Sequence, residues 1–275
     1  MDTPLFSVLD HTLTLGQAVV LIAILLAGLL LGWLLGRSGG GKARATVVKP
    51  AARSASDDAF LKGVTHLMAD HTDQAIEEFT RAVTLNSNTV ETYVVLGNLF
   101  RQKGEIERAV RIRQSIIARP NLTQPVRLQA LYDLGLDYRK GGLFNRAVES
   151  FQEVLAADPN HTEANRELIT LYEEMRDWEK AFEALRRQDR LTGQDSRAVL
   201  AHYKTELGKE YVSAGQLERA EEALELAMKV HRGCLDAYLH LGDLELTRGR
   251  ARKALGTWRK AVKLAPTHAH LVIRR

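Results

Sequence analysis

The residue types that most often carry out chemistry are scattered along this chain. Among the nine histidines, the closest pair, His268 and His270, has no acid or cysteine beside it. Cys234 is the single cysteine, which excludes an internal disulfide and a Cys-x-x-Cys metal site. Consecutive acids such as Glu173 and Glu174 diverge by about 100° on a helix, which is a poor arrangement for a catalytic pair. No glycine-rich phosphate loop, Gly-x-Ser-x-Gly elbow or His-Glu-x-x-His motif occurs. We therefore expect a protein that is not an enzyme and that uses no metal or cofactor.

Charge is distributed unevenly along the sequence. The chain carries 38 Lys and Arg against 34 Asp and Glu, a net charge of +4. Residues 1–54 hold five of the basic residues and two of the acids, which leaves 33 basic residues against 32 acids in the remainder. A nearly neutral body lacks the basic footprint of nucleic-acid-binding proteins, so we expect no nucleic-acid partner.

A pattern of small and large residues recurs six times between residues 56 and 268. Each copy has a central alanine, at Ala75, Ala109, Ala147, Ala181, Ala220 and Ala254. Twelve residues earlier stand Gly63, Gly97, Gly135, Ile169, Gly208 and Gly242. Four residues after the alanine stand Phe79, Arg113, Phe151, Leu185, Leu224 and Trp258. A turn residue lies between the upstream position and the central alanine of each copy. It is Gly104, Gly142, Gly215 or Gly249 in four copies and Asp70 or Arg176 in the other two.

Each copy predicts two amphipathic helices joined by a short turn. We expect Gly97 to let the two helices approach closely at Ala109, and Gly104 to end the first helix in a left-handed conformation. The spacing is 34 residues, apart from about four extra residues at 123–127 and five at 196–200. This is the period of tetratricopeptide repeats, so the predicted fold is an all-α solenoid of about six repeats. The predicted repeats are 56–89, 90–123, 128–161, 162–195, 201–234 and 235–268, and 269–275 is a tail or the start of a truncated repeat.

The N-terminal part of the chain predicts a single membrane anchor. No charged residue occurs from Thr12 to Gly36, and eighteen helical residues span roughly 27 Å, about the hydrocarbon thickness of a bilayer. We expect a short extracytoplasmic segment at 1–15, a transmembrane helix at 16–36 and a basic flexible tether at 37–55 beside anionic lipids. Five basic residues follow the span and none precedes it, which favours cytoplasmic repeats and argues against a cleaved signal peptide.

Three glycines recur at every fourth position of this span, at Gly28, Gly32 and Gly36. Such a face favours close packing on another membrane helix, including that of a second copy in a homo-oligomer. Glycine is also simply tolerated in membrane helices, and the sequence leaves both interpretations open.

The first helices of a tetratricopeptide array line a concave groove that binds protein segments. By their position in the repeat, the polar groove candidates are Asn98, Arg101, Gln102, Arg139, Lys140, Arg166 and Lys209. Arg101, Arg139 and Lys140 form either a modest basic patch or an ordinary solvated face. Arg113 takes a position that is aromatic in other copies, and either a snorkelling stem or an ion pair with a neighbouring acid explains it.

The anchor, the tether and the repeats together resemble the lipopolysaccharide assembly protein B family of Gram-negative bacteria. The likeness is specific over residues 57–155, where it includes LGNLFRQKGEIERAVRIRQ, ARPNL and LGLDYRKGGLFNRA, and weaker beyond. It implies a non-enzymatic inner-membrane scaffold that helps the membrane protease FtsH degrade LpxC, the deacetylase that commits cells to lipid A synthesis. The family usually has more repeats and a rubredoxin-like domain with two Cys-x-x-Cys knuckles, which do not occur in this sequence. The alternative is a generic membrane-anchored repeat protein for envelope assembly or secretion on the periplasmic side.

Overall fold

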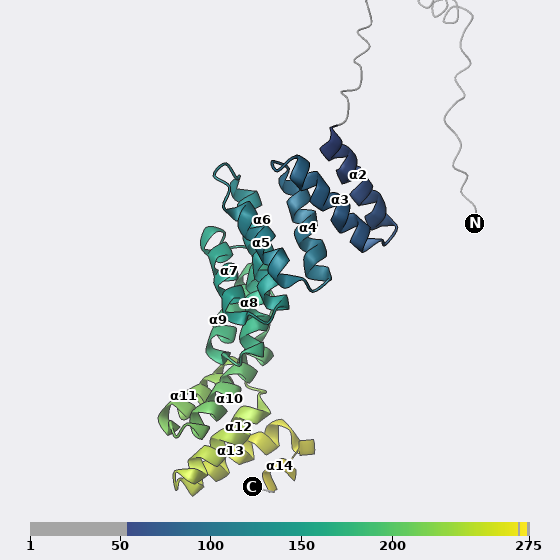
Figure 1. Cartoon of the computed structure of the whole chain (residues 1–275). Helices are drawn as coiled ribbons and strands as arrows, with labels where there is room; N and C mark the ends of the chain where they lie inside the picture. The colour runs from purple at the N-terminus through teal and green to yellow at the C-terminus, as the bar shows by residue number, and fades with distance from the viewer. Residues whose placement is uncertain (1–53, 269, 274–275) are drawn as a thin grey trace, which may run out of the picture. The chain divides into compact units, whose positions relative to one another are not determined.

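The computed structural model describes residues 54–268 and 270–273 (Figure 1). The chain divides into two units, Met1–Ala52 and Arg53–Arg275, and the described residues belong to the second unit. The predicted anchor with Gly28, Gly32 and Gly36, and nearly all of the predicted tether, lie outside the described residues. Within the described part, no helix is both long and apolar enough to cross a bilayer.

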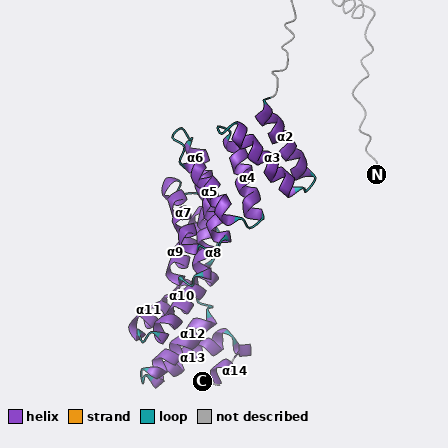
Figure 2. Cartoon of the chain, viewed as in Figure 1, coloured by secondary structure: helices purple, strands orange, loops and turns teal. Residues whose placement is uncertain are grey.

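Twelve α-helices follow one another from Ala55 to Leu264, and no strand interrupts them in the described ranges (Figure 2). They form six helical hairpins. The first helices of these hairpins are α2 (Ala55–Met68), α4 (Val90–Gln102), α6 (Gln124–Lys140), α8 (Thr162–Glu174), α10 (Arg197–Ser213) and α12 (Leu235–Thr247). The second helices are α3 (Thr72–Leu85), α5 (Ile106–Ile117), α7 (Phe144–Ala157), α9 (Trp178–Thr192), α11 (Leu217–Val230) and α13 (Ala251–Leu264). A short 3-10 turn, η1 (Pro266–His268), and α14 (His270–Ile273) follow them.

Each hairpin packs on the next one in the chain. The second helix of every hairpin contacts the first helix of its successor, from α3 against α4 to α11 against α12. The largest apolar cluster extends from α6 to α10 and includes the fully buried Phe151 and Leu171. This stack confirms the predicted all-α solenoid, in which each repeat covers the apolar face of its neighbour.

The two insertions in the 34-residue spacing lengthen helices rather than loops. Helices α6 and α10 have 17 residues each, whereas α4, α8 and α12 have 13. The additional residues lie at the N-terminal ends of the two long helices, which begin at Gln124 and Arg197. Four residues make about one helical turn, so α6 and α10 extend about one turn beyond the other first helices.

In five of the six repeats, the glycine of the first helix faces a bulky side chain of the second helix. A Cβ atom on Gly97 would meet the guanidinium of Arg113 at 2.9 Å, so Gly97 makes room for Arg113. Gly63 faces Phe79 and Gly135 faces Phe151 in the same way. The predicted close approach at Ala109 is not tested by these contacts; what they add is that the nearest neighbour of each of these glycines is the bulky side chain four residues after the alanine.

All six turn positions adopt the left-handed conformation. The four glycines have φ between 72° and 78°, and Asp70 and Arg176 have φ of 58°. Each of these residues ends a first helix and turns the chain into the second. The prediction for Gly104 is confirmed, and the same backbone forms even where the sequence offers a residue with a Cβ atom.

Replacing Arg176 with glycine should stabilise the fourth repeat by about 1 kcal/mol, because the left-handed region costs other residues roughly 1–2 kcal/mol and glycine loses more chain entropy on folding. The ion pair of Arg176 with Glu210 is long at 3.9 Å and exposed, so its loss costs little. Thermal unfolding of Arg176→Gly beside Gly142→Arg tests this, since the two changes should move the melting temperature in opposite directions. A lower melting temperature for Arg176→Gly would contradict the account.

Candidate protein-binding surfaces

The predicted groove residues lie on four of the first helices. Asn98, Arg101 and Gln102 belong to α4, Arg139 and Lys140 to α6, Arg166 to α8 and Lys209 to α10. Gln102, Lys140 and Arg166 are exposed, whereas the other four are partly buried. The partly buried groove residues make contacts within and between repeats, and these contacts determine which of their polar groups are available to a binding partner.

Arg101 is directed at the following repeat. Its Nη1 donates to Asp137 Oδ1 at 2.8 Å and to the backbone oxygen of Asp133 at 3.3 Å. Its Nη2 donates to Asn98 Oδ1 at 3.1 Å. The structure therefore brings Asn98 and Arg101 together, but it employs them at the contact between α4 and α6.

Arg113 is fully buried and joins the same group of charges. Its guanidinium donates to the backbone oxygen of Val94 at 3.2 Å and to the side chain of Asn98. It lies 3.5 Å from the carboxylate of Asp133 and 3.4 Å from that of Asp137. Of the two explanations for Arg113, the ion pair is the one observed. We call Asn98, Arg101, Arg113, Asp133 and Asp137 the α4–α6 charge cluster.

Burial dominates the electrostatics of this cluster. It raises the pKa of the Asp137 carboxyl, although Arg113 and Arg101 pull that pKa down. It also lowers the pKa of the Arg113 guanidinium against the opposing pull of Asp133 and Asp137. Arg113 Nε and Asp137 Oδ2 face each other, yet neither forms a hydrogen bond with the described residues. The charges of Arg113 and Asp137 thus depend on their neighbours in the cluster, because both side chains are fully buried.

Further polar contacts link the later first helices. Arg139 on α6 pairs with Glu167 and, at 3.0 Å, with Glu174, both on α8. Tyr203 on α10 donates a hydrogen bond to Glu173 on α8. Burial raises the pKa of Tyr203, and the hydrogen bond to Glu173 raises that pKa further. Two of the three charges in the predicted basic patch, Arg101 and Arg139, are therefore matched by acids of the adjacent repeat.

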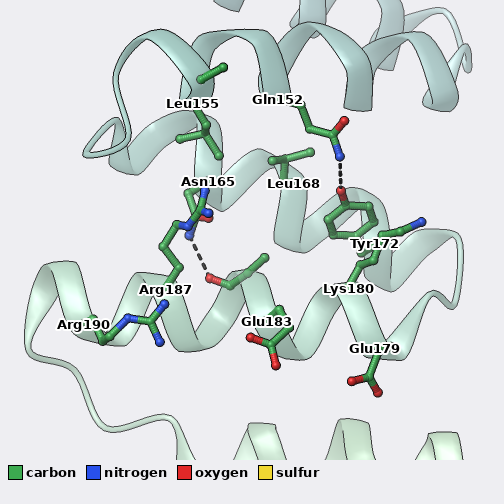
Figure 3. Close-up of a pocket in the computed structure, with 12 residues that line it drawn as sticks. Gln152, Leu155, Asn165, Leu168, Tyr172, Glu179, Lys180, Glu183, Arg187 and Arg190 are labelled. Atoms are coloured by element: carbon green, nitrogen blue, oxygen red, sulfur yellow. Dashed lines mark hydrogen bonds between the residues drawn. The ribbon is translucent and has the colours of Figure 1, made fainter.

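A hollow of about 510 Å³ lies among α7, α8 and α9 (Figure 3), and none of the predicted groove residues lines it. Leu155, Leu168 and Ala184 give it apolar walls, and Arg187 and Arg190 line one end. Further lining residues are Gln152, Ala156, Asn165, Tyr172, Glu179, Lys180 and Glu183. We call it the α7–α9 hollow.

A second hollow of about 500 Å³ lies on the other side of α9, among α9, α10 and α11. Phe182, Leu200 and Leu226 line it together with Lys204. Lys204 is almost wholly buried; its ammonium donates to Glu179 at 2.6 Å and lies 4.3 Å from the Phe182 ring centroid. We call it the α9–α11 hollow; Glu179 and Glu183 of α9 line both hollows.

The repeat pattern alone did not identify these hollows. Each is assembled from three helices, and the sequence pattern ranks helix positions within one repeat only. The exposed side of α9 carries charges of both signs, which the repeat pattern does not distinguish from an ordinary solvated face: Glu179, Lys180, Glu183, Arg186, Arg187 and Arg190. In the described residues, no group of three or more His, Cys, Asp or Glu side chains is arranged to hold a metal ion.

The chain is similar to several known proteins. A tetratricopeptide repeat model matches residues 132–196 and 205–269. Lipopolysaccharide assembly protein B of Escherichia coli is 28% identical over 231 residues, which is 84% of this chain and 58% of the relative. The Haemophilus influenzae protein of that name is 28% identical over 233 residues, 82% of this chain and 57% of the relative. A crystal structure of MamA protein shares 26% identity and covers 67% of this chain and 96% of its own, with a TM-score of 0.40.

The similarity extends beyond the segments that suggested it in the sequence. The resemblance to lipopolysaccharide assembly protein B is confirmed, and the chain spans just under three fifths of the length of these relatives. The tetratricopeptide repeat model matches the last four of the six helical hairpins, and the first two hairpins have the same arrangement of helices.

Proposed function

We propose that this chain is a non-enzymatic adaptor that binds proteins through its tetratricopeptide repeats and acts in lipopolysaccharide assembly. The observation that carries the proposal is the 28% identity to lipopolysaccharide assembly protein B over 84% of the chain. The repeat architecture supports it, because stacked helical hairpins present extended surfaces to other proteins. The sequence adds no motif for catalysis.

We further propose where the adaptor works and which proteins it joins. The charge asymmetry around residues 16–36 supports an inner-membrane anchor with its N-terminus outside and its repeats in the cytoplasm. The family resemblance supports the protease FtsH and the deacetylase LpxC as partners. In this scheme the anchor holds the repeats beside the membrane protease, and the repeats bring LpxC to it.

The topology has a direct test. Alkaline phosphatase fused after Arg275 is expected to be inactive, while a fluorescent protein fused at the same place should be fluorescent, because the positive charges that follow the span hold that side in the cytoplasm. The same fusions made after Met1 should give the opposite result for phosphatase. Active phosphatase at the C-terminus would contradict the cytoplasmic adaptor and support a periplasmic repeat protein instead.

Partner binding is tested by purification of the tagged chain from solubilised membranes. We expect both FtsH and LpxC to be recovered with the full chain, and we expect the recovered amount of each to be similar from one independent preparation to the next. The matched control is the charge-cluster variant Asp137→Ala, in which the contact between the second and third repeats is disrupted. Absence of both proteins from the wild-type preparation would contradict the proposed partners.

A further inference from the structure

The charges of α13 differ from those of every other second helix. Its 14 residues include five basic residues and no acidic one, whereas each of the other five second helices has at least one acid and a net charge between −2 and +2. All five basic residues are exposed, and none of them forms an ion pair or a side-chain hydrogen bond with another residue in the described ranges. They are Arg252, Lys253, Arg259, Lys260 and Lys263.

These cations form one continuous face of the helix. With about 100° between successive residues, Arg252, Arg259 and Lys263 fall within about 40° of one another, on the side of α13 opposite its buried residues. Lys253 and Lys260 flank this row on one side. We call the five residues the α13 basic face.

The stability of the helix does not explain this arrangement. Arg252 and Lys253 stand in the first turn, where the helix dipole disfavours positive charge. Lys263 follows Lys260 by three residues and Arg259 by four, which are the spacings at which like charges on a helix repel each other. Both effects oppose folding, and an anionic partner would relieve both.

The acids of the neighbouring α11 do not neutralise the basic face. Arg248 pairs with Glu218 and Glu221 of α11 at 2.7 Å each, and Arg250 pairs with Glu221 at 3.1 Å. The two arginines that precede α13 therefore already use these acids.

The basic face is an outer surface of the solenoid. Glu225 and Lys229 of α11 take the repeat positions of Arg259 and Lys263. Both are exposed, although α12 of the next hairpin packs on α11. These positions thus stay open in a repeat that has a successor.

We propose that the α13 basic face docks on the anionic headgroups of a lipid bilayer. Cations without nearby acids complement a surface of negatively charged phosphates. The face lies on the outside of a single helix, and no residue of α13 lines either hollow, so it suits a broad surface better than a peptide that needs walls. Leu255, which borders the face and is 53% exposed, can enter the interfacial region beside the headgroups.

This inference rests on the membrane location proposed above, but not on FtsH or LpxC as partners. An anchor that holds the chain at a bilayer raises the effective concentration of the lipid surface, so that docking by five cations is populated. The apolar side of α13 stays packed in the solenoid around Trp258, so the helix docks by its charge and does not insert. Docking would hold the hairpin of α12 and α13 at the same membrane as the anchor.

Quenching of a fluorescent label in vesicles tests the docking in the full chain. In a Cys234→Ser background, Gly256→Cys places the label within the basic face, where an added Cβ meets no atom within 4 Å. The labelled chain is reconstituted into vesicles of phosphatidylcholine alone or with about one third phosphatidylglycerol, each with a nitroxide quencher on some headgroups. We expect quenching at about 0.15 M salt only with phosphatidylglycerol, and its loss at about 1 M salt, where the screening length is about 3 Å.

Charge reversals at equivalent repeat positions provide the matched comparison. Lys260→Glu with Lys263→Glu changes two cations of the basic face, and Arg187→Glu with Arg190→Glu changes two exposed cations at the same repeat positions of α9. Each cation near an anionic surface strengthens binding roughly fivefold, so the α13 pair should lower the ratio of docked to undocked chains at least about twentyfold. The α9 pair should leave that ratio unchanged, and thermal unfolding like that of wild type shows that both variants fold.

Flotation with phosphatidylcholine vesicles reports the anchor, whereas quenching of the label reports α13, so the membrane location and the docking fail separately. Equal quenching with and without phosphatidylglycerol, or equal loss in the α13 and α9 pairs, would overturn the proposal. Release of the label by double-stranded RNA at an equal concentration of phosphate groups would assign the face to nucleic acid and overturn it too. Absence of quenching in every vesicle would leave the face to an acidic protein, again against the proposal.

Discussion

Replacing Asp137 with alanine is expected to lower the free energy of unfolding by about 3–5 kcal/mol, which is the usual cost of removing one partner from a buried ion pair. Asp137 is fully buried and holds both Arg101, at 2.8 Å, and Arg113. Without it, the buried guanidinium of Arg113 keeps only Asp133 as an acid within reach. Urea unfolding of residues 54–275, followed by circular dichroism, measures the change against the wild-type fragment.

A compensated variant shows whether the loss comes from the stranded charge. The position of Arg113 is occupied by Phe79 and Phe151 in neighbouring repeats, where each ring packs against a glycine as Arg113 packs against Gly97. Arg113→Phe combined with Asp137→Leu removes the pair together, and buried pairs exchanged for apolar residues often cost little. We expect the double variant to regain most of the stability. A double variant as unstable as the sum of its single changes would contradict the account.

The second large effect is expected at Gly135, where alanine should cost about 1–3 kcal/mol through overpacking. Its Cβ atom would lie 2.6 Å from Phe151, whose ring is fully buried in the largest apolar cluster and cannot move aside freely. Gly256 provides the matched control, because it also lies within a helix but has no atom within 4 Å of an added Cβ. Gly256→Ala should stabilise the chain by about 0.5–1 kcal/mol through helix propensity alone.

The same unfolding measurement applies to both glycines. If glycine-to-alanine substitution lowers the free energy of unfolding at Gly135 and raises it at Gly256, then the space beside Phe151, and not helix propensity, decides the residue at position 135. Gly135→Ala combined with Phe151→Leu should recover part of the loss, since the fourth repeat already combines a residue that has a Cβ atom, Ile169, with Leu185 at these two positions. Equal stabilisation by both alanines would mean that the ring is not confined as the structure places it.

The repeat period made the helical hairpins and their turns predictable from the sequence. The period predicts contacts within one hairpin, such as those made by Gly104 and the other turn residues. It also predicts the left-handed backbone at Arg176 from the position in the repeat, although arginine disfavours that conformation. The period could not predict that the extra residues near 123–127 lengthen α6, because insertions fit a loop or a helix equally well.

Contacts between repeats were less predictable, for a physical reason. Arg113 required an acid, but the sequence offers many, and only the stacking of α4, α5 and α6 selects Asp133 and Asp137. The same stacking employs Arg101 and Arg139 in ion pairs and creates the hollows beside α9. A pattern that repeats every 34 residues describes each unit well and describes the neighbours of a side chain poorly.

The adaptor proposal is tested most directly by the lifetime of LpxC in cells. Pulse labelling followed by a chase would compare cells that contain the full chain, cells that lack it, and cells that express it with FtsH inactivated. The account predicts rapid loss of LpxC only when the chain and an active FtsH are present together. An LpxC lifetime that is the same with and without the chain would contradict it.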